Sequence, residues 1–147
     1  MTDPTDPTER KGWLGLLAKA PPATLAALWE GAPDHEVLRA PETGAVMVQG
    51  RMGGTGAPFN LGEMTVTRCS VRLPSGEVGH GYVQGRDKDH ARRVALIDAL
   101  MQGPGAADLR ARVLEPLALA AARKAEDRAA KAAATRVEFF TLVRGED

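Results

Sequence analysis

The residues of this chain that could do chemistry are few, and the glycine-rich segment 51–56 is the first of them. Arg51 precedes three closely spaced glycines, Gly53, Gly54 and Gly56. Backbone N–H groups in such a segment can converge on an anion, and an arginine can add positive charge. The Gly-Lys-Ser/Thr ending of a P-loop is missing, however, and no helix start follows. The spacing therefore favours a tight turn, with an anion-binding loop as the alternative.

The segment from Gln84 to His90 is the second candidate, because it combines basic residues with the expected start of a helix. A helix N-terminus flanked by Arg86 could hold an anion. Asp87 and Asp89 already complement the dipole at that end, and Asp87 can accept a hydrogen bond from the first turn. Helix capping by Asp87 is therefore the favoured interpretation, and Arg86 is kept as a binding or interface candidate.

Asp98 is a carboxylate within an apolar helical pattern, between Ile97 and Ala99. A buried carboxylate without a partner destabilises a protein, so Asp98 is expected to form a structural ion pair. Arg68 or Arg72 could provide the partner. A role for Asp98 as a catalytic acid is the alternative.

The remaining nucleophiles and metal ligands form no recognisable set. The three histidines have no metal-ligand spacing. The single cysteine, Cys69, has apolar neighbours at alternate positions, which indicates a buried and unreactive side chain. No serine lies in a nucleophile elbow. The sequence thus predicts no metal, no cofactor and no catalytic residue.

Composition limits the class of protein further. Lys plus Arg and Asp plus Glu balance at 19 each, which gives no electrostatic footprint for nucleic acid or an anionic membrane. No apolar run approaches the ~20 residues of a membrane helix, and the N-terminus lacks a signal-peptide core, so we expect a soluble cytoplasmic protein. The 147 residues suit one domain. We expect a disordered tail over residues 1–11 and a single domain over 12–147.

The elements that must position these residues belong to the α+β class. Apolar spacing predicts N-terminal helices around Trp13–Ala20 and after Pro22. The period then changes to two, which predicts an antiparallel meander. Its strands are expected over residues 35–40, 45–52, 63–73 and 77–83, with a turn over residues 41–44.

Helices should dominate the part of the chain that follows the meander. One helix begins after Asp87, and an Ala-rich helical segment covers about residues 106–134, interrupted near Pro116. Small residues repeat at coiled-coil spacing along that segment, which favours close packing of another helix. They are Ala118, Ala122, Ala125, Ala129 and Ala132.

The last element expected is a C-terminal strand over residues 136–144. Its side chains alternate, and Phe139 and Phe140 make both of its faces partly apolar. A strand of this kind is buried on both sides or lies against another subunit. We therefore treat the two phenylalanines as interface candidates and expect the chain to self-associate when it is alone.

Three blocks of the chain, taken in order, resemble the PhnG family, the G subunit of the carbon–phosphorus lyase core complex. They run from Glu42 to Arg68, from Val83 to Gln102 and from Thr135 to Gly145. The resemblance covers nearly the whole chain. It implies a role in phosphonate catabolism, in which a phosphonate such as methylphosphonate displaces adenine from ATP. The product of that step is α-D-ribose 1-methylphosphonate 5-triphosphate.

The resemblance also implies partners. In this family the first step requires the G, H, I and L subunits, and the J subunit later cleaves the carbon–phosphorus bond. The chain would be an accessory subunit of an obligate hetero-oligomer, with no activity alone and with the I subunit as its most direct partner. The alternatives are a freestanding enzyme for a phosphorylated small molecule and a homo-oligomeric anion-binding module, each using the 51–56 loop.

Overall fold

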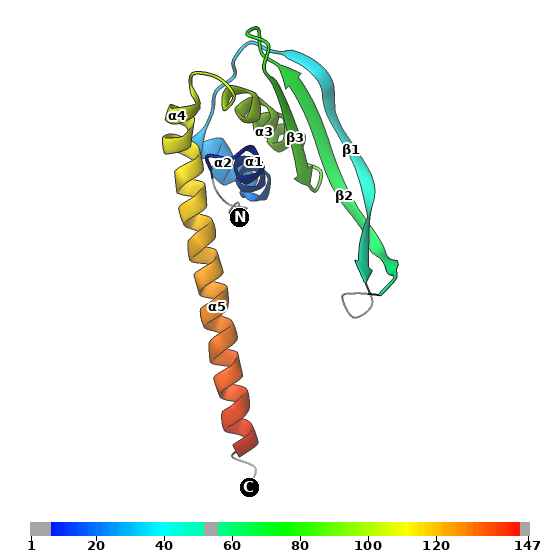
Figure 1. Cartoon of the computed structure of the whole chain (residues 1–147), viewed down its shortest axis with the longest axis vertical. Helices are drawn as coiled ribbons and strands as arrows, with labels where there is room; N and C mark the ends of the chain where they lie inside the picture. Colours follow the sequence, from blue (N-terminus) through cyan, green and yellow to red (C-terminus); the bar gives the residue numbers. More distant parts are fainter. Residues whose placement is uncertain (1–6, 52–55, 145–147) are drawn as a thin grey trace.

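The computed structural model of the chain describes residues 7–51 and 56–144, with the side chains of Asn60 and residues 138–144 left out. Helices precede and follow an antiparallel sheet, so the fold is α+β, as predicted (Figure 1). The elements follow in the order α1 (Arg10–Lys19), α2 (Pro22–Leu28), β1 (Glu36–Arg51), β2 (Pro58–Arg72), β3 (Val78–Gln84), α3 (Lys88–Leu100), α4 (Ala106–Leu109), η2 (Arg110–Leu114) and α5 (Glu115–Arg144).

The strands that the structure describes form an antiparallel meander in the order β1-β2-β3. Residues 36–51 make one continuous strand, so the expected turn over residues 41–44 is wrong. Pro41 is tolerated because β1 is an edge strand, where a proline need not interrupt the ladder of hydrogen bonds. The register shifts between Arg39 and Glu42, and this irregularity absorbs the local distortion. β2 begins at Pro58, earlier than the pattern predicted.

Helices α1 and α3, with α2 beside them, lie on one face of the sheet (Figure 1). The apolar stripe predicted for the first helix is confirmed, because Trp13, Leu16 and Leu17 are buried. Alternate residues of β2 and β3 face the helices across the core, as a period of two requires. The fully buried members of this core include Leu25, Val71, Val83, Val94, Ile97, Val113 and Leu114.

Two glycines of β3 allow α3 to lie directly on the sheet. A Cβ atom at Gly79 would overlap the carbonyl oxygen of Ala95, and one at Gly81 would overlap that of Ala91. Both obstacles belong to the helix backbone and cannot rotate away. The distance between α3 and the sheet therefore depends on the absence of side chains at these two positions.

The chain after α3 is helical as far as Arg144, so the expected C-terminal strand is wrong. No proline or glycine occurs between Leu117 and Arg144, and the Ala-rich stretch has a high helix propensity, which outweighs the alternation over residues 136–144. The interruption expected near Pro116 is the π-helical turn of η2. Its wider turn accommodates a proline ring that would clash in a regular helix. None of the described helices is long and apolar enough to cross a membrane.

Two parts of the molecule extend from its body in the same general direction (Figure 1). The first, which we call the ribbon, comprises residues 45–51 of β1 and 58–65 of β2, beyond the end of β3. The second, the helical arm, comprises residues 122–144 of α5. Burial ends where the arm begins, because Leu117 is buried and every residue from 122 to 137 is exposed.

Candidate interaction surfaces

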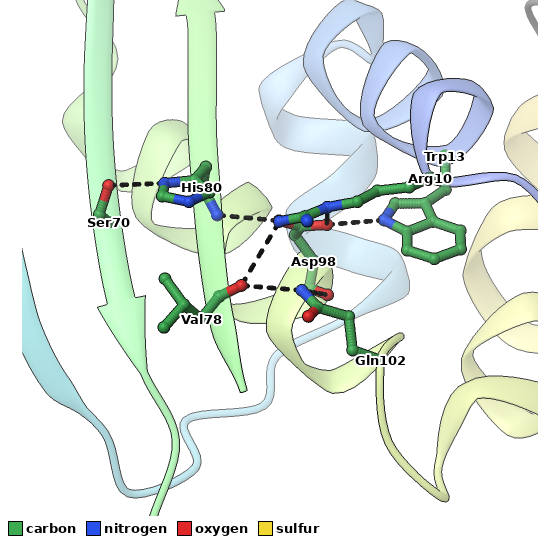
Figure 2. A network of polar contacts seen from close by, with 7 residues as sticks. All are labelled: Arg10, Trp13, Ser70, Val78, His80, Asp98 and Gln102. Atoms are coloured by element: carbon green, nitrogen blue, oxygen red, sulfur yellow. Dashed lines mark hydrogen bonds and ion pairs between the residues drawn. The ribbon is translucent and has the colours of Figure 1, made fainter. Parts of the chain in front are cut away.

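Asp98 is fully buried on α3 and accepts four hydrogen bonds (Figure 2). Its Oδ1 accepts from Nε of Arg10 at 3.2 Å and from Nε1 of Trp13 at 2.8 Å. Its Oδ2 accepts from Nη2 of Arg10 and from the backbone N–H of His80, both at 2.9 Å. The hydrogen bond and the charge of Asp98 raise the pKa of the Arg10 guanidinium, which stays protonated. This carboxylate therefore joins α1, β3 and α3.

The partner of Asp98 is Arg10, so the expected pairing with Arg68 or Arg72 is wrong. Those two arginines are exposed on the opposite face of the sheet, because the period of two points even-numbered residues of β2 away from α3. Arg10 belongs to the segment 1–11, which was expected to be a disordered tail. Since α1 begins at Arg10, that expectation is wrong for the last two residues of the segment.

The same network covers the outer edge of β3 at Val78 and His80 (Figure 2). The backbone N–H of His80 donates to Asp98. The carbonyl oxygen of Val78 accepts from Nε2 of Gln102 at 2.8 Å and from Nη2 of Arg10 at 3.4 Å. Two of the backbone groups of β3 that could pair with a further strand are thereby occupied by side chains of the same molecule.

The start of α3 is organised by Asp87, which lies at the N-cap position. Its Oδ1 accepts from the backbone N–H of His90 at 2.9 Å. Arg86, the candidate beside this cap, is exposed. The imidazole of His90 is buried, and its Nε2 lies 2.9 Å from the carbonyl oxygen of Leu17. The first turn of α3 is therefore tied to α1 as well as capped.

The other face of the sheet is open to solvent. On it, Oγ of Ser70 lies 2.9 Å from Nδ1 of His80 on the neighbouring strand (Figure 2). Tyr82, two residues further along β3, is 49% exposed. Its register partner Arg68 is also exposed. This face thus carries polar and aromatic side chains rather than a core stripe.

Cys69 faces the helices and is 1% exposed. Burial raises the pKa of its thiol, and the charge of Arg92 opposes this shift only in part. The thiol is therefore protonated and shielded from reagents, as the sequence indicated. Among the described residues, no three His, Cys, Asp or Glu side chains come together in a way that could hold a metal ion.

The glycine-rich segment connects β1 to β2. Arg51 ends β1, is exposed, and donates from Nη1 to the carbonyl oxygen of Gly56 at 3.3 Å. Gly53 and Gly54 lie outside the described residues. The structure thus gives one internal hydrogen bond across the loop, and anion binding there stays a prediction.

The ribbon exposes apolar side chains that a two-stranded element cannot cover. Met47 is 52% exposed, Phe59 is 42% exposed and Leu61 is 63% exposed. Phe59 and Leu61 lie together over Gly50, where a Cβ would be 3.3 Å and 3.0 Å from their nearest atoms. An isolated two-stranded ribbon is marginally stable in water, and exposed apolar clusters mark interaction sites.

The helical arm is uncovered along its described length. Leu119, just before the arm, is 56% exposed and Val137 within it is 65% exposed. Four of the five small residues expected to pack against another helix, Ala122, Ala125, Ala129 and Ala132, lie here and are exposed, whereas Ala118 precedes the arm and packs against the core. The backbone at Phe139 and Phe140 is helical, and their side chains lie outside the described residues. Packing of a partner on this arm therefore stays a prediction.

The sequence does not predict the roles of Arg10 and Gln102. Each looks like an ordinary polar residue near a helix end, and the contact of Arg10 with Asp98 spans 88 positions of the chain. A usable signal does exist for Gly79 and Gly81. Two glycines spaced by two on the core face of a strand indicate that another backbone approaches closely.

A compact α+β body with an exposed apolar ribbon and an exposed Ala-rich helical arm is typical of a protein that assembles with other chains. The family model described as "Phosphonate metabolism protein PhnG" matches residues 8–145, so the chain belongs to the PhnG family, and the resemblance noted in the sequence is confirmed. A curated protein of Rhizobium meliloti (strain 1021) is named "Alpha-D-ribose 1-methylphosphonate 5-triphosphate synthase subunit PhnG". It is 49% identical over 152 aligned residues, which cover 99% of this chain and 96% of the relative.

Proposed function

We propose that this chain is the G subunit of an α-D-ribose 1-methylphosphonate 5-triphosphate synthase and that it acts through assembly, without a catalytic residue of its own. The Rhizobium meliloti relative bears the name of that subunit, and the identity of 49% extends over nearly all of both chains. The observation that carries the proposal is the uncovered surface of the ribbon and the helical arm. Apolar side chains exposed in this way are stabilised when partner subunits cover them.

Three of the polar groups that could serve as acids or bases are engaged in contacts that hold the body together. Asp98 accepts four hydrogen bonds, Asp87 caps α3, and His90 bonds to a backbone carbonyl group. Displacing adenine from a ribose requires a positioned nucleophile and stabilisation of an oxocarbenium-like centre. We therefore assign these tasks to partner subunits.

The proposed partners are the H, I and L subunits in the synthase step and the J subunit in the later cleavage, with the I subunit contacted most directly. Arg51 and Arg86 are exposed and available at such an interface. Phe139 and Phe140 are proposed for it on sequence alone. The cytoplasmic location and the hetero-oligomeric state stay predictions.

The test compares adenine release from ATP and methylphosphonate by the purified chain, by the other synthase subunits without it, and by the full set. We expect release only from the full set, together with co-purification of this chain with the I subunit. If the other subunits are fully active without this chain, it is not a required subunit of the synthase.

Activity of the chain alone leads to a different conclusion. If adenine release by the chain alone exceeds background and one substitution in this chain abolishes it, the chain is a freestanding enzyme. Arg86→Ala and Ser70→Ala are suitable substitutions for that control, because neither side chain belongs to the buried network of Asp98.

A further inference from the structure

The two edges of the sheet differ in what their backbone groups contact. At β3, side chains of Arg10, Asp98 and Gln102 occupy the outward N–H of His80 and the outward C=O of Val78. At β1, the described residues provide no backbone partner on the outer side of residues 43–48. Side chains of the same molecule therefore occupy part of the β3 edge, whereas the β1 edge is free over residues 43–48.

The register shows which groups of β1 face outward. The carbonyl oxygen of Thr65 accepts from the backbone N–H of Gly85 on the β3 side at 2.8 Å. The backbone N–H and C=O groups of Thr65 therefore point away from β1, where its register partner Ala45 lies. In an antiparallel ladder, the backbone groups of Ala45 then point away from β2 as well. The same direction applies to the backbone groups two residues before and after Ala45. The N–H and C=O groups of Thr43, Ala45 and Met47 accordingly lie on the free edge.

The composition of this edge lacks the devices that usually protect one. Residues 43–48 read Thr-Gly-Ala-Val-Met-Val and contain no charge and no proline. Natural edge strands are generally blocked by lysine, proline, bulges or a covering element. Here Pro41 and the irregular register stop short of the segment, and residues 42–48 keep one regular register with β2.

We propose that residues 43–48 of β1 accept an extended strand of another synthase subunit, so that the sheet continues across the subunit interface. This inference rests on the proposed function. Only another main chain offers donors and acceptors at the spacing that Thr43, Ala45 and Met47 present. Because residues 43–48 carry no charge, they favour a partner strand that is also uncharged. The exposed Met47 would add an apolar contact beside the backbone hydrogen bonds.

A second copy of this chain fits the edge less well. An antiparallel pairing of two copies about Ala45 would set the Arg51 end of each strand beside the Arg39 end of the other. Like charges that face each other across strands are destabilising, although the salt bridge of Arg39 with Glu42 reduces this repulsion. A strand from a different subunit avoids this repulsion.

The proposal is tested with the full chain and the other synthase subunits. Ala45→Pro removes one outward N–H and leaves the β1–β2 ladder intact, because that group does not bond β2. Ala45→Val keeps the N–H and serves as the matched control. We expect Ala45→Pro to weaken association by about tenfold or more and Ala45→Val to bind like the wild type. Circular dichroism melting of each isolated variant checks that it folds.

Hydrogen exchange of the wild-type chain gives an independent measurement. Peptides that cover residues 42–49 should exchange about tenfold or more slowly in the assembled complex than in the free chain, while peptides of β3 change little. Unchanged exchange at 42–49 on assembly, or full association of a folded Ala45→Pro variant, would overturn the inference and leave the proposed function standing. Protection of the same peptides in a homodimer of the free chain would assign the edge to a second copy instead. Failure of the wild-type chain to bind any other subunit would overturn the proposed function itself.

Discussion

In the body of the molecule, the structure places a fully buried carboxylate among four donors, whereas the ribbon and the helical arm leave apolar side chains and a strand edge in water. The body joins α1, β3 and α3 through Asp98 and packs α3 onto glycines. In the projections, by contrast, Met47, Leu61 and Val137 are all more than half exposed. Both kinds of region occur in one chain of 147 residues.

The difference separates the residues that hold the fold from those that await a partner. Contacts within the body have already been made, so their removal should lower the free energy of unfolding of the isolated chain. Contacts of the ribbon and the helical arm would form only in a complex, so changes there should affect assembly and leave the isolated chain nearly unchanged.

The largest loss is expected for Asp98→Ala. The substitution leaves Nε1 of Trp13 and the backbone N–H of His80 without an acceptor inside the body, and it deprives Arg10 of its ion-pair partner. We expect the free energy of unfolding to fall by about 3–5 kcal/mol. Urea denaturation followed by circular dichroism measures this change.

Arg10→Ala is the control for this prediction. The side chain of Arg10 is 45% exposed, so its removal leaves Asp98 with two of its donors and access to water. We expect a loss of only about 1–2 kcal/mol. Equal losses for both variants would mean that the ion pair, rather than the burial of the other donors, governs the stability of the body.

Gly81→Ala should have the second-largest effect, because the new Cβ meets the backbone of α3 at Ala91. The helix must move away from β3, and overpacking of this kind costs about 2–3 kcal/mol. Gly44→Ala in β1 is the matched change outside the body, since nothing lies within 4 Å of the added atom. We expect a change within about 0.5 kcal/mol for Gly44→Ala. Thermal melting of both variants measures this difference. Equal decreases in the melting temperature of Gly81→Ala and Gly44→Ala would contradict the prediction.

Much of the body could be predicted from the sequence because its signals are local. The stripe of Trp13, Leu16 and Leu17, the Asp87 cap and the alternation around Cys69 each depend on residues within a few positions of one another. The α+β class of the fold follows from the order in which these helix and strand signals occur along the chain. The burial of Asp98 follows too, since its helical neighbours are apolar.

The errors have physical causes that a local pattern does not contain. Arg10 pairs with Asp98 across 88 positions, and strand alternation removes Arg68 and Arg72 from reach. Pro41 resembles a turn signal, yet an edge strand tolerates a proline. The alternation over residues 136–144 resembles that of a strand, although an uninterrupted helix leads into it. No pattern in a single sequence tells which backbone groups at a sheet edge are bonded to side chains from distant parts of the chain.

The smallest effect is expected in the helical arm, and it tests whether that arm folds together with the body. Ala129 is exposed on α5 and Ala95 is buried on α3.

Replacing alanine with glycine in a helix costs about 1 kcal/mol from propensity alone, provided that the helix belongs to the cooperative unit. We expect Ala95→Gly to lower the free energy of unfolding by about 1–2 kcal/mol, because it also removes a buried methyl group. For Ala129→Gly we expect the free energy of global unfolding to fall by less than about 0.5 kcal/mol, and amide exchange to become faster only within the arm. Every residue from 122 to 137 is exposed, so local unfolding of the arm need not disturb the core. Urea denaturation and hydrogen exchange, measured on both variants, test whether the arm unfolds together with the body. If Ala129→Gly lowers the free energy of unfolding as much as Ala95→Gly does, the arm belongs to the cooperative unit of the body.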